Sequence, residues 1–152
     1  MTVHRSVDKQ AITQVLNHPQ VFHSLTDDRS PFFYEATVAP HIIYLMDETQ
    51  HGVIRIDPVN GITCSAHIAT MPEMWGTAVD FVKDALDWGF RYTHYLKVMA
   101  LIPVFNKNAM SLATRSGFER EGILKKSFLK NWKLHDQIIF GLCKKGERIW
   151  QQ

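Results

Sequence analysis

The chain has 152 residues, 45% of them hydrophobic, and its 17 basic and 15 acidic side chains give a net charge of +2. This length and apolar content suit one globular domain, residues 1–152, with a buried core. So small a net charge does not favour binding to nucleic acid or to an anionic membrane. No apolar run approaches the roughly 20 residues of a membrane helix, and the N-terminus lacks a secretory apolar segment. We therefore expect a cytoplasmic protein that binds neither nucleic acid nor a membrane.

Cysteine and histidine usage indicates neither a disulfide framework nor a metal site. Cys64 and Cys143 each lie inside an apolar, strand-like run, and are interpreted as small core residues in a reducing compartment. The eight histidines are spread through the chain, without a His-Glu-x-x-His motif or a close Cys/His cluster. We expect no bound metal.

The N-terminal region predicts a short edge strand and two helices. Residues 2–6 favour the strand, and apolar residues at helical spacing follow from Asp8 to the residue before Pro19. Residues 19–25 predict a second helix, with proline in its first turn. Residues 31–40, PFFYEATVAP, are ambiguous between loop and strand, and their apolar side chains are a candidate surface for a homodimer or a protein partner.

The middle of the chain predicts an antiparallel meander followed by a crossover. Residues 41–47, 51–57 and 62–69 are β-rich runs separated by turn signals. After a loop opened by Pro72, apolar residues at helical spacing predict a long amphipathic helix. Because a helix precedes it, the strand beginning near Tyr95 must lie parallel to its neighbour. The predicted fold is a mixed α/β sheet, mostly antiparallel, with one parallel pair at its centre and flanking helices.

Residues 97–118, KVMALIPVFNKNAMSLATRSGF, predict a buried strand, a turn opened by Pro103, and a short helix that ends at Gly117. Asparagine at position 106 suits the N-cap of that helix. Six residues of this stretch fall at the specified positions of a known sequence motif: Asn106, Ala109, Met110, Leu112, Gly117 and Phe118. They resemble N-x-x-A/S-I-x-L-x-x-x-x-G-F, a motif of the GNAT N-acetyltransferase superfamily.

The residues that follow, EREGILKKSFLKNWKLHDQIIFGL, resemble the strand pair that closes the GNAT fold. The likeness is to acetyltransferases of the ribosomal-protein-alanine type, with Asp136 at the acidic position. The resemblance implies a GNAT-like fold and transfer of an acetyl group from acetyl-CoA to an amine: a protein N-terminus, a lysine or a small amine. It also implies that strands four and five splay so that pantetheine lies between them, and that the two N-terminal helices form one wall of the acceptor site.

The expected cofactor loop is MPEMWGTAVDF, since a pyrophosphate needs backbone N–H donors at a helix N-terminus. In the superfamily this loop reads Q/R-x-x-G-x-G/A, which places Glu73, Gly76 and Ala78 on the three specified positions. An alternative alignment puts Trp75 where arginine is usual. Either way the basic residue is missing, and Glu73 opposes an anion. The expected acetyl-CoA contacts are Ile68, Thr70, Gly76, Thr77, Ala78 and Asn106.

Amide formation needs an uncharged amine and therefore a base, because a lysine amine is mostly protonated at neutral pH. A strand N–H can stabilise the oxyanion. Related enzymes often carry a catalytic glutamate where this chain has Ser65, which cannot act as a base. His67 lies on the same strand face, with a reference pKa of about 6.5 that suits this role. Our candidate catalytic residues are His67 and Ser65; the structural alternative for His67 is a partly buried histidine that bonds to a neighbour.

Departures from the superfamily pattern support a second hypothesis. The usual general acid is a tyrosine, and the resemblance puts Ala113 at its position. Together with Glu73 and Ser65, this favours a catalytically inactive GNAT-like binding or assembly protein. Small GNAT-like proteins encoded near head-assembly genes of tailed phages are loosely similar. Because a fold does not establish its chemistry, both hypotheses stay open.

Overall fold

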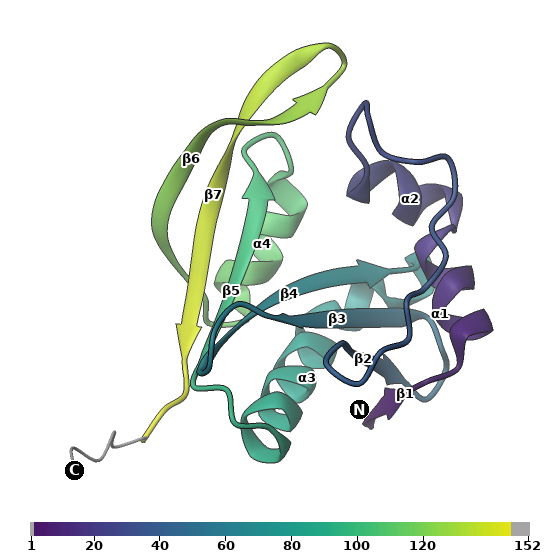
Figure 1. Cartoon of the computed structure of the whole chain (residues 1–152), viewed down its shortest axis with the longest axis vertical. Coiled ribbons are helices and arrows are strands. Elements are labelled where there is room, and N and C mark those ends of the chain that lie inside the picture. Colours follow the sequence, from purple (N-terminus) through teal and green to yellow (C-terminus); the bar gives the residue numbers. More distant parts are fainter. Residues whose placement is uncertain (1, 147–152) are drawn as a thin grey trace.

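The computed structural model describes residues 2–146 (Figure 1). Its elements, in chain order, are β1 (Val3–Ser6), α1 (Lys9–Leu16), α2 (Pro19–Leu25), β2 (Ile43–Asp47), β3 (Gly52–Pro58), β4 (Thr63–Thr70), the 3-10 helix η1 (Pro72–Thr77), α3 (Ala78–Tyr92), β5 (Lys97–Pro103), α4 (Lys107–Arg115), β6 (Glu119–Lys130) and β7 (Lys133–Cys143). The strands form one sheet in the order β1-β2-β3-β4-β5-β7-β6. Only β4 and β5 pair in parallel. The predicted mixed sheet with one parallel pair and flanking helices is confirmed.

The helix boundaries follow local chemistry. Asp8 accepts a hydrogen bond from the Ala11 N–H at 3.1 Å, and Asn106 accepts one from the Ala109 N–H at 3.1 Å. Each bond satisfies a donor that the first helical turn leaves free, so both residues act as N-caps. Gly117 follows α4 with a φ of 102°, a left-handed conformation that favours glycine.

The ambiguous residues 31–40 form no regular strand. Side chains of α1 and its C-cap residue bind their backbone instead: the C-cap Asn17 donates to the Tyr34 carbonyl at 2.6 Å and accepts from its N–H at 2.9 Å. The Thr13 hydroxyl accepts from the Ala36 N–H at 3.2 Å. These bonds replace the strand partner that the segment lacks. Phe32 and Phe33 remain exposed, at 101% and 60%.

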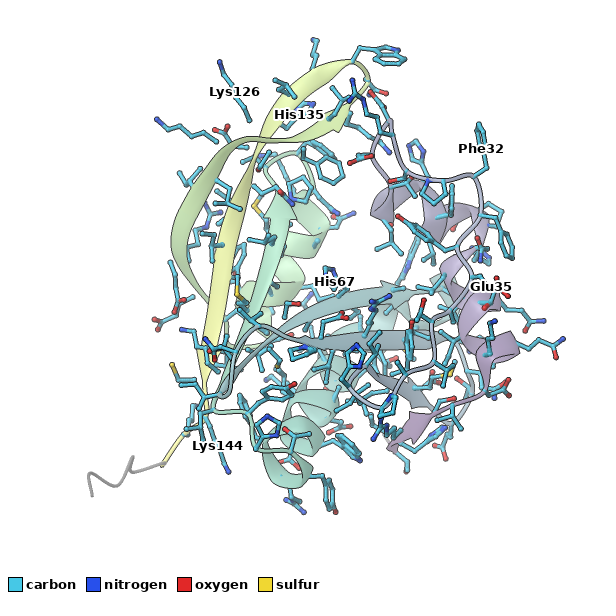
Figure 2. All side chains as sticks on the ribbon, in the orientation of Figure 1. Phe32, Glu35, His67, Lys126, His135 and Lys144 are labelled. Atoms are coloured by element: carbon cyan, nitrogen blue, oxygen red, sulfur yellow. The ribbon has the colours of Figure 1, made fainter. Side chains whose placement is uncertain are left out.

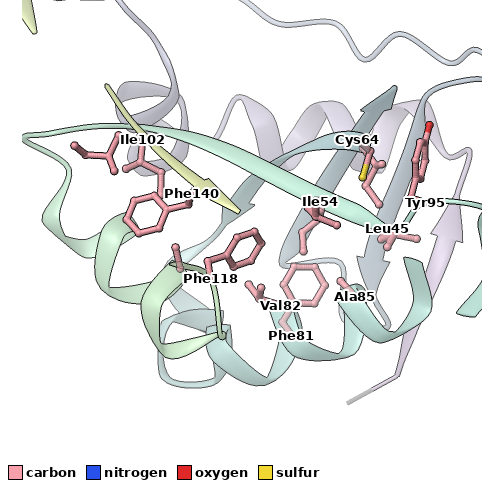
Figure 3. Close-up of a cluster of buried hydrophobic side chains, with 14 of the residues drawn as sticks. Leu45, Ile54, Cys64, Phe81, Val82, Ala85, Tyr95, Ile102, Phe118 and Phe140 are labelled. Carbon is pink, nitrogen blue, oxygen red and sulfur yellow. The ribbon is translucent and has the colours of Figure 1, made fainter. Parts of the chain in front are cut away.

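The core has two parts, one on each face of the sheet. The larger lies between the sheet and α3 with α4, and includes Leu45, Ile54, Phe81 and Phe140 (Figure 3). The smaller lies between the sheet and α1 with α2. Gly52 lets η1 and α3 approach β3 closely, because a Cβ there would meet Met74 Sδ at 2.5 Å and Phe81 Cε2 at 2.8 Å. This close packing places the start of α3 beside the end of β4.

Ser116, the C-cap residue of α4, offers a stability test. Its hydroxyl is buried, with the residue 5% exposed, and makes no hydrogen bond within residues 2–146. A buried hydroxyl without a partner costs about 1–3 kcal/mol. We therefore expect Ser116→Ala to raise the free energy of unfolding by about 1 kcal/mol in urea denaturation.

The matched control is Ser30→Ala, since the Ser30 hydroxyl accepts from the Asp27 N–H at 3.0 Å and donates to Asp27 Oδ1 at 3.1 Å. That variant should lose about 0.5–1.5 kcal/mol. A comparable loss at Ser116 would contradict the interpretation that its hydroxyl is unsatisfied.

Candidate functional site

The site forms where the central parallel pair of strands separates. Residues 63–65 of β4 pair with residues 97–99 of β5, although β4 continues to Thr70 and β5 to Pro103. In Figure 1, β3 and β4 lie across the view, whereas β5 and β7 lie along its vertical direction. Beyond Ser65 and Met99, therefore, β4 and β5 no longer pair with each other.

Hydrogen bonds at the two ends of the β3–β4 ladder show which backbone groups face this splay. Met71 N–H donates to the His51 carbonyl at 2.8 Å, and Val59 N–H donates to the Thr63 carbonyl at 2.9 Å. Hydrogen-bonded pairs alternate along an antiparallel ladder, so odd-numbered β4 residues direct their backbone groups to β3. The N–H and C=O groups of the even-numbered residues then point towards β5. Beyond the paired segment these are Ala66, Ile68 and Thr70.

A cavity of about 290 Å³ occupies the splay and reaches both faces of the sheet. On one side it is lined by α3 and α4, and on the other by Ser24 and Leu25 of α2 and by Phe128 and Gln137 of the β6–β7 hairpin. No Asp, Glu, Lys or Arg is among the described residues that line it. The walls are therefore apolar, with polar groups limited to neutral side chains and the free strand edges.

His67 points from β4 into this space (Figure 2). Burial lowers the pKa of its imidazole below the usual 6.5, the nearby Asp57 carboxylate opposes that shift, and Arg55 adds to it. Arg55 is the cross-strand partner of His67, and its guanidinium binds both Asp57 oxygens, at 2.8 and 2.9 Å. The imidazole is exposed to water on one side, and protein surrounds its other sides. Because its pKa lies below 6.5, the ring is neutral at pH 7 and able to accept a proton.

Ser65, the other candidate catalytic residue, lies at the closed end of the splay. It faces Asp57 on β3 and Met99 on β5, in the last pair before the strands separate. The cavity lining includes His67, Ile68 and Asn106, but not Ser65, Thr70 or the residues of the expected cofactor loop. Three of the predicted site residues therefore line one cavity, and the others lie outside its lining.

The expected cofactor loop is the helix η1, which runs directly into α3. Gly76 and Thr77 are exposed, Ala78 is buried, and a Cβ on Gly76 would meet nothing within 4 Å. No side chain caps the α3 N-terminus, where Thr77 is the N-cap residue. Because η1 continues into α3, the backbone at this junction is already helical, and its nearest charges are the acidic Glu73 and Asp80.

Other cavity residues limit the chemistry available. The Asn106 side chain uses Oδ1 to cap α4, and its Nδ2 makes no bond to another described residue. Burial raises the pKa of the Cys64 thiol to about 11, so it stays protonated and is a poor nucleophile. Ala113 presents only a methyl group. The arrangement suits direct attack by an external nucleophile, with no covalent intermediate on cysteine.

Comparison with solved structures identifies the fold. A spermidine N-acetyltransferase from Vibrio cholerae, crystallised with CoA and spermine, matches with a TM-score of 0.76 and 18% identity, covering 93% of this chain and 94% of that one. A ribosomal-protein-S5-alanine acetyltransferase from Vibrio fischeri matches with a TM-score of 0.70 and 16% identity, covering 97% and 94%. The chain has the GNAT fold. No protein-family model matches the sequence, and comparison with curated proteins finds no match.

Two further features concern what the GNAT fold could bind here. None of the helices among residues 2–146 is long and apolar enough to cross a membrane. Within the same residues, no group of three or more His, Cys, Asp or Glu side chains is arranged to hold a metal ion.

Asp136, the acidic position of the GNAT strand pair, accepts from the Lys126 N–H at 2.8 Å and so supports a bulge where Lys126 has a φ of 51°.

Sequence reasoning missed a bridge between the loop after α2 and the β6–β7 hairpin. Asp28 accepts from the N–H groups of Asn131, at 3.1 Å, and Trp132, at 2.7 Å. The Lys130 ammonium donates to the carbonyls of His23, at 2.9 Å, and Thr26, at 2.7 Å, at the C-terminal end of α2. The bridge spans the α2 side of the cavity.

The local signal for this bridge is the hairpin turn itself. Asn131 and Trp132 have φ values of 52° and 60°, the conformation of a type I′ turn, in which glycine usually follows asparagine. Tryptophan in this position costs about 1–2 kcal/mol. Such a turn implies support from elsewhere in the chain, although the sequence does not show that Asp28 provides it.

We expect Asp28→Ala to destabilise the hairpin because two turn N–H groups lose their acceptor. Hydrogen exchange at Asn131 and Trp132 should accelerate at least tenfold, because both amides then face water without an acceptor. The control is Asp27→Ala, since Asp27 bonds to Arg29 and Ser30 rather than to the hairpin. Equal exchange in wild type and Asp28→Ala would show that the bridge does not hold the turn.

Proposed function

We propose that this protein is an acetyl-CoA-dependent N-acetyltransferase whose acceptor is the α-amino group of a polypeptide N-terminus. The observation that carries the proposal is the splay between β4 and β5, with an apolar cavity through it and a neutral His67 at its side. The presence of CoA in one of the structural neighbours supports a thioester donor.

The free edge of β4 fits the donor. The pantetheine arm of CoA carries amide groups, which need hydrogen-bond partners when they are buried. Ala66, Ile68 and Thr70 direct backbone groups into the splay, and at its rim lies the Asn106 Nδ2, which has no partner within residues 2–146. The Thr70 carbonyl already accepts from the Trp75 indole at 3.2 Å. That bond ties the end of β4 to η1, beside the helix terminus that would meet the phosphates.

The charge around the phosphate position is less favourable. The pyrophosphate would lie against the exposed Gly76 and Thr77 at the start of α3, where the helix dipole favours an anion. Glu73 and Asp80 oppose that anion, and no basic side chain belongs to this segment. Affinity for the donor would therefore rest mainly on the backbone and on the apolar walls. When bound, acetyl-CoA supplies an activated acyl group as a thioester.

His67 is the proposed base. It would take one proton from the incoming ammonium group, while an unpaired N–H on β4 would donate to the carbonyl oxygen that gains negative charge. As the C–N bond forms and the C–S bond breaks, the thiolate of CoA would take the second proton of the amine and leave as a thiol, and His67 would return its proton to water. Proton transfer to a base whose pKa is about 6.5 or less is uphill by about 5 kcal/mol from a lysine ammonium, but only by about 2 kcal/mol from an α-ammonium. The geometry and the base strength together favour an N-terminal α-amine.

The cavity walls support the same choice of acceptor. Spermine accompanies one structural neighbour, but a polyamine carries several charges that need carboxylate partners when they are desolvated. No acidic side chain lines this cavity among the described residues. Exposed aromatic side chains flank the hairpin tip and the loop after α2: Phe32, Phe33, Phe105 and Trp132. They offer contact area for a polypeptide.

Donor binding tests the proposal directly. Calorimetric titration with acetyl-CoA should show saturable binding, and Gly76→Glu should weaken it at least tenfold by adding a carboxylate beside the phosphates. Gly61→Glu is the matched control, because both glycines are exposed and have open space around the added Cβ. Absence of binding to wild type would contradict the proposal and favour the alternative of a binding or assembly protein.

The pH dependence of turnover tests the base. Because its pKa lies below the usual 6.5, His67 should lose its neutral form only as the pH falls through that lowered value. With a saturating peptide acceptor, kcat should be level near pH 7 and fall on the acid side. His67→Gln should lower kcat by about 10²–10⁴-fold and remove the acid limb.

The histidine control is His4→Gln on the exposed edge strand β1, which should keep the wild-type profile. Acetyl-CoA affinity should be similar in His67→Gln and wild type. The acceptor class is tested separately, with a peptide bearing a free N-terminus, an N-terminally blocked lysine peptide, and spermine. A wild-type acid limb that persists in His67→Gln would remove His67 from the mechanism.

A further inference from the structure

The cavity continues past the point where β4 and β5 separate. Cys64 and Val98, partners in the paired segment, are part of its lining. So are Gly89 in α3 and Thr93 and Tyr95 after it. Gly89 lies roughly 16 Å along the α3 axis from the start of that helix, where the phosphates would bind. Beyond the splay, the cavity therefore extends beneath the closed part of the sheet.

This inner part has different chemistry from the splay. Its strand edges are already paired with each other, so they offer no hydrogen bonds to the amides of pantetheine. The Thr93 hydroxyl donates to the Gly89 carbonyl. Cys64 is protonated, and burial raises the pKa of the Tyr95 phenol, so neither carries charge at pH 7. What remains is mostly hydrocarbon: Ile56, Ala85, Leu86, Phe90 and Val98.

Small residues create the space. Ala85 and Gly89 lie one helical turn apart on α3, and Ala113 faces the cavity from α4. Glycine in a helix interior is less stable than alanine, yet a Cβ on Gly89 would first meet Ile56 Cδ1, at an ordinary 3.9 Å. The site has room for a larger side chain. The whole cavity, at about 290 Å³, is about twice the roughly 150 Å³ of an engineered apolar cavity that admits benzene.

We propose that the inner part of this cavity binds the acyl chain of the donor, and that the preferred donor carries a straight acyl chain of about four to eight carbons rather than acetyl. The inference rests on the proposed transfer from a CoA thioester to an amine, and it replaces acetyl with a longer acyl chain as the preferred group. The thioester would lie in the splay near His67, and the alkyl chain would pass between α3 and the paired residues Cys64 and Val98.

Calorimetry of the full chain with CoA, acetyl-CoA, butanoyl-CoA and hexanoyl-CoA tests the inference. Each methylene that becomes buried should tighten binding about fourfold, so hexanoyl-CoA should bind at least tenfold more tightly than acetyl-CoA. Gly89→Leu should abolish that preference, because its side chain would fill the inner cavity, and should change acetyl-CoA affinity by less than about threefold.

Two variants serve as controls. Gly89→Ala adds one methyl group and should keep most of the chain-length preference, and Gly61→Leu adds the same side chain as the blocking variant at an exposed turn, where it should change nothing. If Gly89→Leu fails to fold, the wild-type series decides alone. Acetyl-CoA binding as tight as hexanoyl-CoA would overturn this inference and leave the proposed function standing. Failure of CoA and every ester to bind would overturn both.

Discussion

The separation of β4 from β5 is the constraint on which the rest of the molecule depends. Unpaired backbone groups inside a sheet are costly, so strands separate only where each is held on its other side. Here β4 pairs with β3 as far as Thr70, and β5 pairs with β7 as far as Pro103. The sheet twists apart as two parts, and α3 with α4 covers both. Phe81 of α3 belongs to one core with Ile54 of the first part and with Ile102 and Phe140 of the second. The splay is thus built into the packing.

A second contact system closes the opposite face. The hairpin of β6 and β7 extends beyond the end of β5 and reaches the loop after α2 (Figure 1). Charged side chains make this contact by binding backbone groups: Asp28 holds the turn, and Lys130 holds the end of α2. Hydrogen bonds between a charged and a neutral group are stronger than those between neutral groups, which suits a contact with little apolar area. The cavity therefore opens beneath a bridge held by polar contacts.

The parts of the fold that depend on local sequence patterns could be predicted. Periodicity located the strands and the helix that begins near Asp8, the N-cap at Asn106 set the start of α4, and the intervening helix required β5 to be parallel to β4. Alternation put Ser65 and His67 on one face, but it could not show that the sheet is still closed at Ser65 and open at His67. The splay itself was implied only by family resemblance, because no residue pattern marks where two neighbouring strands stop pairing.

The bridge could not be predicted because its partners are about a hundred residues apart and none is unusual in its own segment. Asp28 looks like an ordinary loop carboxylate and Lys130 like one of several basic residues. Only the tryptophan in a turn that favours glycine indicated that something distant compensates. Residues 31–40 were ambiguous for a related reason: their backbone is satisfied by side chains of α1, and a side-chain partner leaves no alternating pattern in the segment it binds.

The departures from the GNAT pattern acquire a different meaning inside the structure. Ala113 has only a methyl group where the GNAT pattern has a tyrosine. Ala85 and Gly89 are also small, so the side of α3 that lines the cavity fills little of it, and apolar surface is left open to the cavity. The apolar side chains that line an unfilled cavity lack the burial and dispersion contacts that a filled core would give them. Larger side chains at these positions would supply those contacts. A chain that only needed the fold would gain stability by filling this space. An apolar ligand group offsets the same loss, which is the physical reason to associate these small residues with a bound acyl chain rather than with loss of function.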